Sequence, residues 1–312
     1  MPSFQEFSFN SSTGENKIYA CKCIPDCKPR AVIQIAHGVA DYINRYREFM
    51  EYMAEKGFVV AGNDHLGHGQ NIKNEFDVGF FAAENGWTHA VRDMDNLRDI
   101  LREEYHDIPY ILLGHSMGSF LARTYAINYP NKYDALILSG TGHMSPAVTT
   151  AGFALCQAAV KKYGPRKNAK LLNDIAFGAY NKKIDNPKTA FDWINSDDEM
   201  VAKYVADPLC GFICKTSLYR DMMGGIRFIT NQKNIDKMNK ESPVYFFAGK
   251  EDPVGEYGAG VERAYKAFCH AGIRDVFMKL YPGGRHEMLN EPNRLQVYDD
   301  ILQWIEMRID SM

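Results

Sequence analysis

The stretch YILLGHSMGSFLARTYA, residues 110–126, decides the fold, because a strand-like run, a turn and a helix-like pattern follow one another in it. Residues 110–113 form a short apolar run, as in a fully buried strand. After Ser116, apolar residues recur at helical spacing until Pro130. Residues 114–118, GHSMG, therefore predict a sharp strand-to-helix turn that presents a serine nucleophile. An ordinary glycine-rich turn fits the same five residues, so the rest of the chain must supply partners for the serine.

Strand patterns alternate with helix patterns through residues 1–140 and again over residues 242–312. This alternation implies right-handed crossovers and a mainly parallel sheet flanked by helices. We expect one α/β core built on eight strands, whose sequences are FQEFSFNS, KIYACKCI, AVIQIAHG, FVVAGNDH, YILL, ALILSG, VYFFAGKED and DVFMKLYPG.

The segment 141–241 breaks this rhythm, since it contains no convincing strand pattern. Its apolar patches GFALCQAAV, LLNDIAFGAY and SLYRDMMGGIRFI are typical of helices. No linker rich in proline, glycine and serine flanks it, which argues against a separate domain. We expect a helical lid inserted after the sixth strand, above the carboxyl edge of the sheet.

Composition restricts the function classes. The chain has 312 residues, a net charge of −3 and scattered lysines and arginines, so we expect no nucleic-acid partner. The N-terminus lacks the charged and apolar regions of a signal peptide, and no apolar run is long enough to span a bilayer. Seven irregularly placed cysteines favour reduced thiols in a cytoplasmic protein.

Two clusters could suggest a metal. Cys21, Cys23 and Cys27 lie close together, but the first two share a strand face and no matching His/Cys pair follows. In GNDHLGHGQN, residues 62–71, Asp64, His65 and His68 could suggest metal ligands, but the glycines and the position after a strand favour a hydrogen-bonded turn that braces the floor of the site. We expect no metal and no cofactor.

Two strand ends after residue 241 supply partners for Ser116. GKEDPVG places Asp252 there, with Glu251 as its rival, and YPGGRHEM places His286 there. Taken alone, Asp252 fits a turn and His286 a surface loop. Together they give the order nucleophile, acid, histidine that α/β-hydrolases use. Because a serine hydroxyl needs a base that a third group orients, these residues are the expected catalytic triad.

Ester and amide cleavage also needs donors for a developing oxyanion. The backbone N–H of Met117 follows the nucleophile at a helix N-terminus, where negative charge is favoured. The loop after the third strand, AHGVAD, brings the N–H of Val39 into range. We expect His37 in this loop to brace it rather than to act as a base.

AHGVAD, DHLGHGQN, GHSMGS, GKEDPVG and YPGGRHEMLNE, in this order over nearly the whole chain, resemble α/β-hydrolases of the monoacylglycerol lipase, lysophospholipase and serine-aminopeptidase-like group. The resemblance implies a lid, and FDWINSDDEMVAKYVADPLCGF is similar to the lid segment of bacterial lysophospholipase-like members. It implies Ser116 as nucleophile, Asp252 as acid, His286 as base, and Val39 and Met117 as oxyanion donors.

The chain departs from that group at two positions. Ser119 replaces a glycine after GHSMG, and Asp41 stands where the loop usually has glutamate. Both changes leave the chemistry intact and bear on the fit of the substrate's head group.

The expected function is hydrolysis of carboxylic esters of monoacyl lipids through an acyl-enzyme on Ser116, with a small acyl ester as substrate and transient membrane or micelle contact through the lid. Apolar lid side chains are expected to line an acyl-chain trench: Phe153, Leu155, Leu171, Leu172, Phe177, Trp193, Tyr204, Phe212, Leu218, Met222 and Met223.

One alternative is an amidase or aminopeptidase, which would need an acidic lid group from Asp197, Asp198 and Glu199. Another is a catalytically silent binding protein, although such a protein is expected to lose a triad residue.

Overall fold

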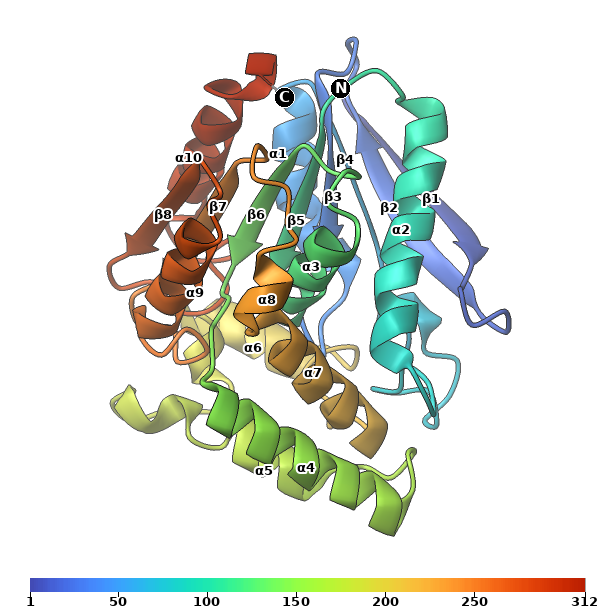
Figure 1. Ribbon diagram of the computed structural model, residues 1–312, viewed down its shortest axis with the longest axis vertical. Helices are drawn as coiled ribbons and strands as arrows, with labels where there is room; N and C mark the ends of the chain where they lie inside the picture. The colour runs from blue at the N-terminus through green and yellow to red at the C-terminus, as the bar shows by residue number, and fades with distance from the viewer. Residues whose placement is uncertain (312) are drawn as a thin grey trace.

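The computed structural model describes residues 1–311, and eight strands form one sheet in this part of the chain. The strands are β1 (Ser3–Asn10), β2 (Lys17–Ile24), β3 (Ala31–Ala36), β4 (Phe58–Asn63), β5 (Tyr110–His115), β6 (Ala135–Ser139), β7 (Val244–Gly249) and β8 (Val276–Tyr281). Their order across the sheet is β1-β2-β4-β3-β5-β6-β7-β8 (Figure 1). The β1–β2 and β2–β4 pairs are antiparallel and the other pairs are parallel. The predicted mostly parallel eight-stranded sheet is confirmed.

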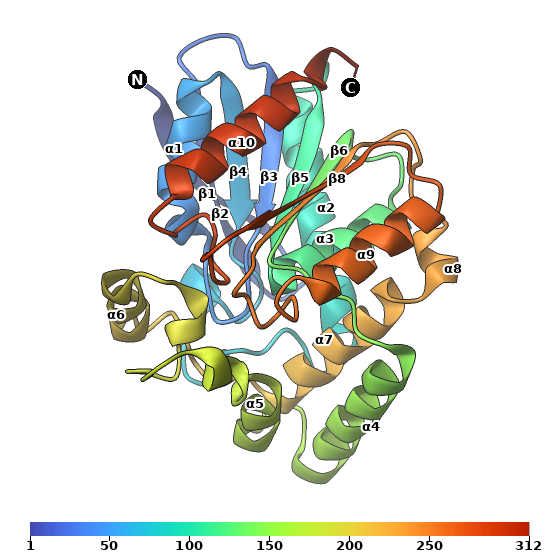
Figure 2. The ribbon, with the colours of Figure 1, turned by 90° about the vertical axis from the view of Figure 1, so that its left-hand side faces the viewer.

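Helices cover both faces of the sheet (Figure 2). One face packs against α1 (Arg47–Glu55) and α10 (Arg294–Glu306), and the other against α2 (Gly86–Glu104), α3 (Met117–Asn128) and α9 (Ala259–His270). Short 3-10 helices are η1 (Ile43–Tyr46), η2 (Gly69–Asn71) and η5 (Ile309–Ser311). Because both faces are covered, every residue of β3 to β7 is buried, and these strands read as continuous apolar runs.

Residues 141–241 connect the neighbouring strands β6 and β7 without adding a strand to the described sheet. They form α4 (Pro146–Tyr163), α5 (Lys170–Phe177), η3 (Tyr180–Lys183), η4 (Asp192–Ile194), α6 (Asp198–Ala206), α7 (Thr216–Ile229) and α8 (Gln232–Ile235). Figures 1 and 2 show α4, α5 and α6 beyond the carboxyl edge of the sheet. The helix α7 packs against α4 and also against α2 and α3, whose apolar core it shares. The insertion is thus helical, and its action as a lid stays a prediction.

The seven cysteines all lie among the described residues and are unpaired thiols. Cys21 and Cys23 are buried on one face of β2, whereas Cys27 is exposed. Within residues 1–311, no helix has both the length and the apolar character needed to cross a bilayer.

Candidate active site

Ser116 occupies a sharp turn between β5 and α3. Its backbone has φ +54° and ψ −123°, a positive-φ conformation that residues other than glycine seldom adopt. The Ser116 N–H donates to the carbonyl of Ser139 at 2.9 Å, which ties the turn to the end of β6. Ser119, the departure from the glycine of the similar group, donates its hydroxyl to the Ser116 carbonyl at 2.6 Å. The strand, sharp turn and helix predicted for this stretch are therefore present.

The two glycines of GHSMG allow backbone to approach backbone closely. A Cβ on Gly118 would lie 2.0 Å from the carbonyl oxygen of Ala36, and a Cβ on Gly114 would lie 2.4 Å from the carbonyl oxygen of Gly118. Neither position can hold a side chain, because the clashing atoms are backbone. Because Gly114 and Gly118 have no side chain, α3 can start directly against the end of β3. This brings Ser116 next to the loop that follows β3, where a Cβ on Gly38 would lie 3.3 Å from the Ser116 Cβ.

Asp252 and His286 are brought together at the carboxyl ends of β7 and β8. The His286 Nδ1 lies 3.0 Å from the Asp252 Oδ2, and both side chains are buried. A carboxylate only accepts, so Nδ1 is the donor, and in the neutral imidazole Nε2 is the nitrogen without a proton. Asp252 also accepts the Val254 N–H at 2.9 Å, whereas Glu251 is exposed. Of the two candidate acids, Asp252 is the one that contacts the histidine.

Two aromatic rings pack against the His286 imidazole. The His115 ring lies 4.7 Å from it and the Trp193 ring 5.1 Å, measured between centroids. Burial lowers the pKa of His115 to about 4, so this neighbouring histidine is uncharged near neutral pH. Trp193 belongs to η4 of the insertion. The imidazole thus contacts both a core residue and an insertion residue.

Val39 and Met117 lie near Ser116 and carry the two backbone amides expected to bind an oxyanion. Both residues line the same cavity as Ser116. Among residues 1–311, neither amide donates a hydrogen bond to another protein group. Two unengaged amides next to a serine, one of them at the N-terminus of α3, are suited to bind a negatively charged oxygen.

Buried histidines form hydrogen bonds with the backbone of the loop after β3 and of the neighbouring turn at residues 62–71. The N–H of His65 donates to His37 Nε2 at 2.9 Å, so His37 carries its proton on Nδ1 and donates to the Gly38 carbonyl at 2.8 Å. Asp64 accepts the N–H groups of Ile43 and Gln70, and burial raises its pKa to about 7. These bonds are those of the turn that the sequence favoured. Within the described residues, no group of three His, Cys, Asp or Glu side chains is arranged to hold a metal ion.

A largely apolar cavity of about 350 Å³ opens at Ser116. Its walls come from α4, α5, α7 and the loop after β7. Five of the eleven apolar residues expected to form a trench line it, namely Leu155, Leu172, Phe177, Met222 and Met223. Pro253, Val254 and Glu256 also line it and were not singled out from the sequence, although they follow the same strand end as Asp252.

The other six expected trench residues do not line this cavity. Leu218 is buried in the core and Leu171 is exposed. Trp193 covers His286, and Tyr204 donates its hydroxyl to the Ala40 carbonyl. Phe212, Trp193 and Tyr204 line a second cavity of about 150 Å³, which shares Val39, Phe177 and Tyr219 with the first. Phe153 faces a cleft elsewhere. Helical spacing identified apolar residues but not which side of the insertion each one faces.

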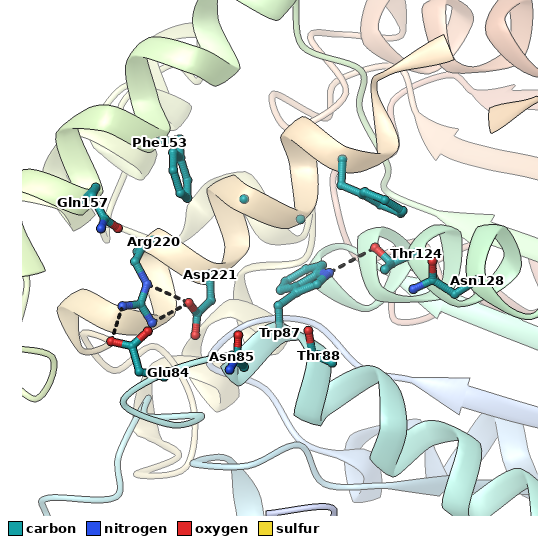
Figure 3. Close-up of a pocket in the computed structure, with 13 residues that line it drawn as sticks. Glu84, Asn85, Trp87, Thr88, Thr124, Asn128, Phe153, Gln157, Arg220 and Asp221 are labelled. Atoms are coloured by element: carbon teal, nitrogen blue, oxygen red, sulfur yellow. Dashed lines mark hydrogen bonds and ion pairs between the residues drawn. The ribbon is translucent and has the colours of Figure 1, made fainter. Parts of the chain in front are cut away.

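That cleft, of about 410 Å³, is lined by Arg220 and Asp221 of α7 and by Trp87 of α2 (Figure 3). Figure 3 shows Arg220 paired with Asp221, and the Trp87 indole N–H donating to Thr124 at 3.0 Å. Burial raises the pKa of Asp221 to about 6. Gly225 of α7 meets the Trp87 ring so closely that a Cβ would lie 2.2 Å from it. The cleft is therefore lined by other residues of α7 than those that line the Ser116 cavity.

The acidic run considered for an amidase lies away from the cavity. Asp197 caps α6 by accepting the Glu199 N–H at 2.8 Å. Asp198 is exposed and pairs with Lys188. None of the three lines either cavity near Ser116. Glu256 is the acidic residue of the cavity lining, and it pairs with Arg263.

The sheet order and the serine elbow between β5 and α3 define an α/β-hydrolase. The chain belongs to the family described as serine aminopeptidase, S33, which matches residues 27–293. The resemblance inferred from the motifs is confirmed.

Comparison with known proteins supports the same class. The chain is 29% identical over 305 residues to the monoacylglycerol lipase of Mycolicibacterium smegmatis, covering 96% of each chain. It is 24% identical to human monoglyceride lipase, covering 91% of this chain and 85% of that one. A thermostable carboxyl esterase from Bacillus coagulans, solved in complex with glycerol, superimposes with a TM-score of 0.92 at 32% identity, over 98% of this chain and 99% of that chain.

Proposed function

We propose that this protein is a serine hydrolase that cleaves carboxylic esters of monoacyl lipids, such as monoacylglycerols or lysophospholipids. The observation that carries the proposal is the position of Ser116, at an elbow with positive φ and at the mouth of an apolar cavity. The similarity to a monoacylglycerol lipase and to a carboxyl esterase supports it.

In the proposed mechanism, Ser116 Oγ attacks the ester carbonyl while His286 Nε2 takes its proton. Asp252, bonded to the other ring nitrogen, stabilises the imidazolium that forms. The N–H groups of Val39 and Met117 bind the oxyanion. The imidazolium then protonates the leaving alcohol, and water, activated by the same histidine, hydrolyses the acyl-enzyme.

A single acyl chain suits the cavity at Ser116. Its lining is mostly aliphatic and aromatic, and each methylene of a bound chain that leaves water contributes about 0.8 kcal/mol. The smaller cavity beyond Val39 offers space for the alcohol portion, and Asn173 and Asp174 in its lining supply polar groups. One chain and a small polar head group together describe a monoacyl lipid.

Helices α4 and α5 are proposed to act as a lid that meets lipid aggregates. They expose five large apolar side chains, Val148, Leu155, Tyr163, Leu171 and Ile175. Val148, Leu155 and Ile175 also line the cavity, so the exposed apolar surface continues into it. Lys161, Lys162 and Lys170 lie on the same helices. Apolar side chains flanked by lysines favour brief contact with a membrane or micelle surface.

A fluorophosphonate probe and a set of substrates test the proposal. We expect the probe to label Ser116, and kcat/KM for p-nitrophenyl esters to rise from acetate to octanoate. Monoacylglycerols should be cleaved faster than triacylglycerols, and aminoacyl-β-naphthylamides hardly at all. Peptidase activity above esterase activity, or a strict acetate preference, would reject the lipid substrate and leave the serine mechanism standing. Absence of labelling would reject the mechanism itself.

A further inference from the structure

Arg45 joins two loops that carry different parts of the active site. Its Nη1 lies 2.9 Å from Asp41 Oδ1 and 2.7 Å from Glu287 Oε1, and its Nη2 lies 2.7 Å from Glu287 Oε2. The contact with Glu287 is therefore bidentate, which fixes the direction of the carboxylate as well as its distance. Arg45 and Glu287 are 242 residues apart in the chain, whereas Asp41 lies only four residues before Arg45. Both carboxylates contact the Arg45 guanidinium.

One end of this bridge fixes the loop that follows β3. Asp41 accepts the Gly38 N–H at 3.3 Å, the Tyr42 N–H at 2.8 Å and the Tyr46 hydroxyl at 2.8 Å. These bonds define the turn that carries Val39. Asp41 thus orients the loop that carries the Val39 amide.

The other end fixes the loop of the catalytic histidine. Glu287 follows His286 directly, and its N–H donates to the Ile194 carbonyl at 2.7 Å. Tyr204 of the insertion packs against the guanidinium, with the Arg45 Cζ 4.9 Å from the centroid of the tyrosine ring. The Tyr204 hydroxyl donates to the Ala40 carbonyl. Arg45 is therefore enclosed by the loop after β3, the His286 loop and α6.

Stability alone does not explain this cluster. The exposed side-chain fractions are 13% for Arg45, 4% for Asp41 and 8% for Glu287, so three charges are held largely out of water. Burial by itself raises the pKa of Asp41, but the charge of Arg45 and the hydrogen bonds from Arg45 and Tyr46 together hold this pKa below its ordinary value. At a buried position, well-packed apolar side chains often stabilise the folded protein as much as a buried ion pair does. What the charges add is a fixed geometry between the two carboxylates.

We propose that Arg45 is a positioning residue that fixes the His286 loop relative to the loop of Val39, and so aligns the proposed base with the proposed oxyanion site. The inference rests on the proposed function. Arg45 does not line the cavity at Ser116, so its effect is exerted on the alignment of reacting groups rather than on substrate binding.

The test compares Arg45→Met and Arg45→Lys with the wild-type protein on p-nitrophenyl butyrate. Misalignment of reacting groups by about 1 Å costs up to about 10²-fold in rate, so we expect Arg45→Met to lose about 10- to 100-fold in kcat with little change in KM. Lysine keeps the charge but not the bidentate contact, and should lose less. Arg294→Met, which removes a surface pair with Glu48, is the matched control and should keep the wild-type kcat.

Two further readouts separate positioning from general damage. Added guanidinium should restore part of the kcat of Arg45→Ala, and the losses in Arg45→Met and Glu287→Gln should be less than additive in the double variant. A wild-type kcat in Arg45→Met or Arg45→Lys, or an effect on KM alone, would overturn the inference. If Arg45→Met fails to fold, Arg45→Lys decides the matter. A wild-type protein that no fluorophosphonate labels would reject the proposed function instead.

Discussion

Trp193 of the insertion lies against His286 of the core, with their ring centroids 5.1 Å apart. The segment around this tryptophan is bonded to the histidine loop. Arg285 donates to the carbonyls of Asp192 at 2.6 Å and Asn195 at 2.8 Å. This part of the insertion therefore belongs to the frame of the site.

The bonds of this segment divide the insertion into two parts. The Ser196 N–H donates to Glu291 at 3.0 Å, and the Asn195 side chain donates to the Asn290 carbonyl at 2.8 Å. Helices α4 and α5 present exposed apolar side chains, and α4 packs against α7. We therefore expect the proposed lid to consist of α4 and α5, with residues 192–196 remaining bonded to the His286 loop.

Ser116→Ala should abolish ester hydrolysis and probe labelling while the protein remains folded. Loss of the nucleophile costs about 10⁴- to 10⁶-fold in kcat. The measurement is fluorophosphonate labelling of the purified variants, with Ser119→Ala as the matched control that should still be labelled. Labelling retained in Ser116→Ala would refute the assignment.

Asp252→Asn should lower kcat by roughly 10⁴-fold, because the amide cannot stabilise the imidazolium and favours the wrong tautomer. Glu251→Gln should have a far smaller effect, since Glu251 is exposed and does not contact His286. Steady-state kinetics of both variants decide between the two acids. The reverse pattern would make Glu251 the acid.

Filling the cavity should change chain-length selectivity. For the wild-type protein, each added methylene should raise kcat/KM by up to about fourfold until the cavity is full. Cys156 is buried and lines the cavity, so Cys156→Phe should end this rise at a shorter chain. Cys269 is exposed, and Cys269→Phe should leave the series unchanged. Identical series for both variants would mean that the acyl chain binds elsewhere.

His68→Gln should make stability less sensitive to acid. Burial lowers the pKa of His68 to about 4, whereas an unfolded histidine titrates near 6.5. The unfolded state therefore binds more protons between these values, and the free energy of unfolding falls as pH drops from about 6.5 to about 4. This histidine contributes up to about 1.4 kcal/mol per pH unit to that slope.

Urea unfolding of the wild-type protein and His68→Gln at pH 7, 6 and 5 measures the difference. Asp64, with a pKa raised to about 7, titrates with the opposite sign but is present in both proteins. The difference between the two slopes therefore isolates His68. Parallel slopes would show that His68 does not stay neutral in the folded state.

The sequence predicts the sheet and the elbow well because both depend on local patterns. Runs buried on two sides read as apolar strings, and the close approaches at Gly114 and Gly118 leave a short motif in the chain. Asp252 and His286 could be proposed because parallel strands end at one edge. Glu251 and Asp252 could not be separated with certainty from spacing, since that depends on which side chain faces the histidine.

Contacts made by distant segments could not be predicted in the same way. Arg45 and Glu287 are far apart in the chain, and nothing in either local sequence names the other. The apolar residues of the insertion were recognised, but Trp193 covers the histidine and Leu218 joins the core, because tertiary packing decides which face each helix presents. The spacing of apolar residues predicts that a helix forms, but it does not predict which face of the helix packs against the core.

The contact between Gly118 and the Ala36 carbonyl has a consequence for mutational libraries. A Cβ placed 2.0 Å from a backbone oxygen clashes in every rotamer, so even alanine cannot replace Gly118. A random library selected for hydrolysis should return wild-type glycine at positions 114 and 118 as consistently as serine at position 116. Deep sequencing would then mark as essential two codons whose residues contribute no reacting atom, and would do so purely for lack of room.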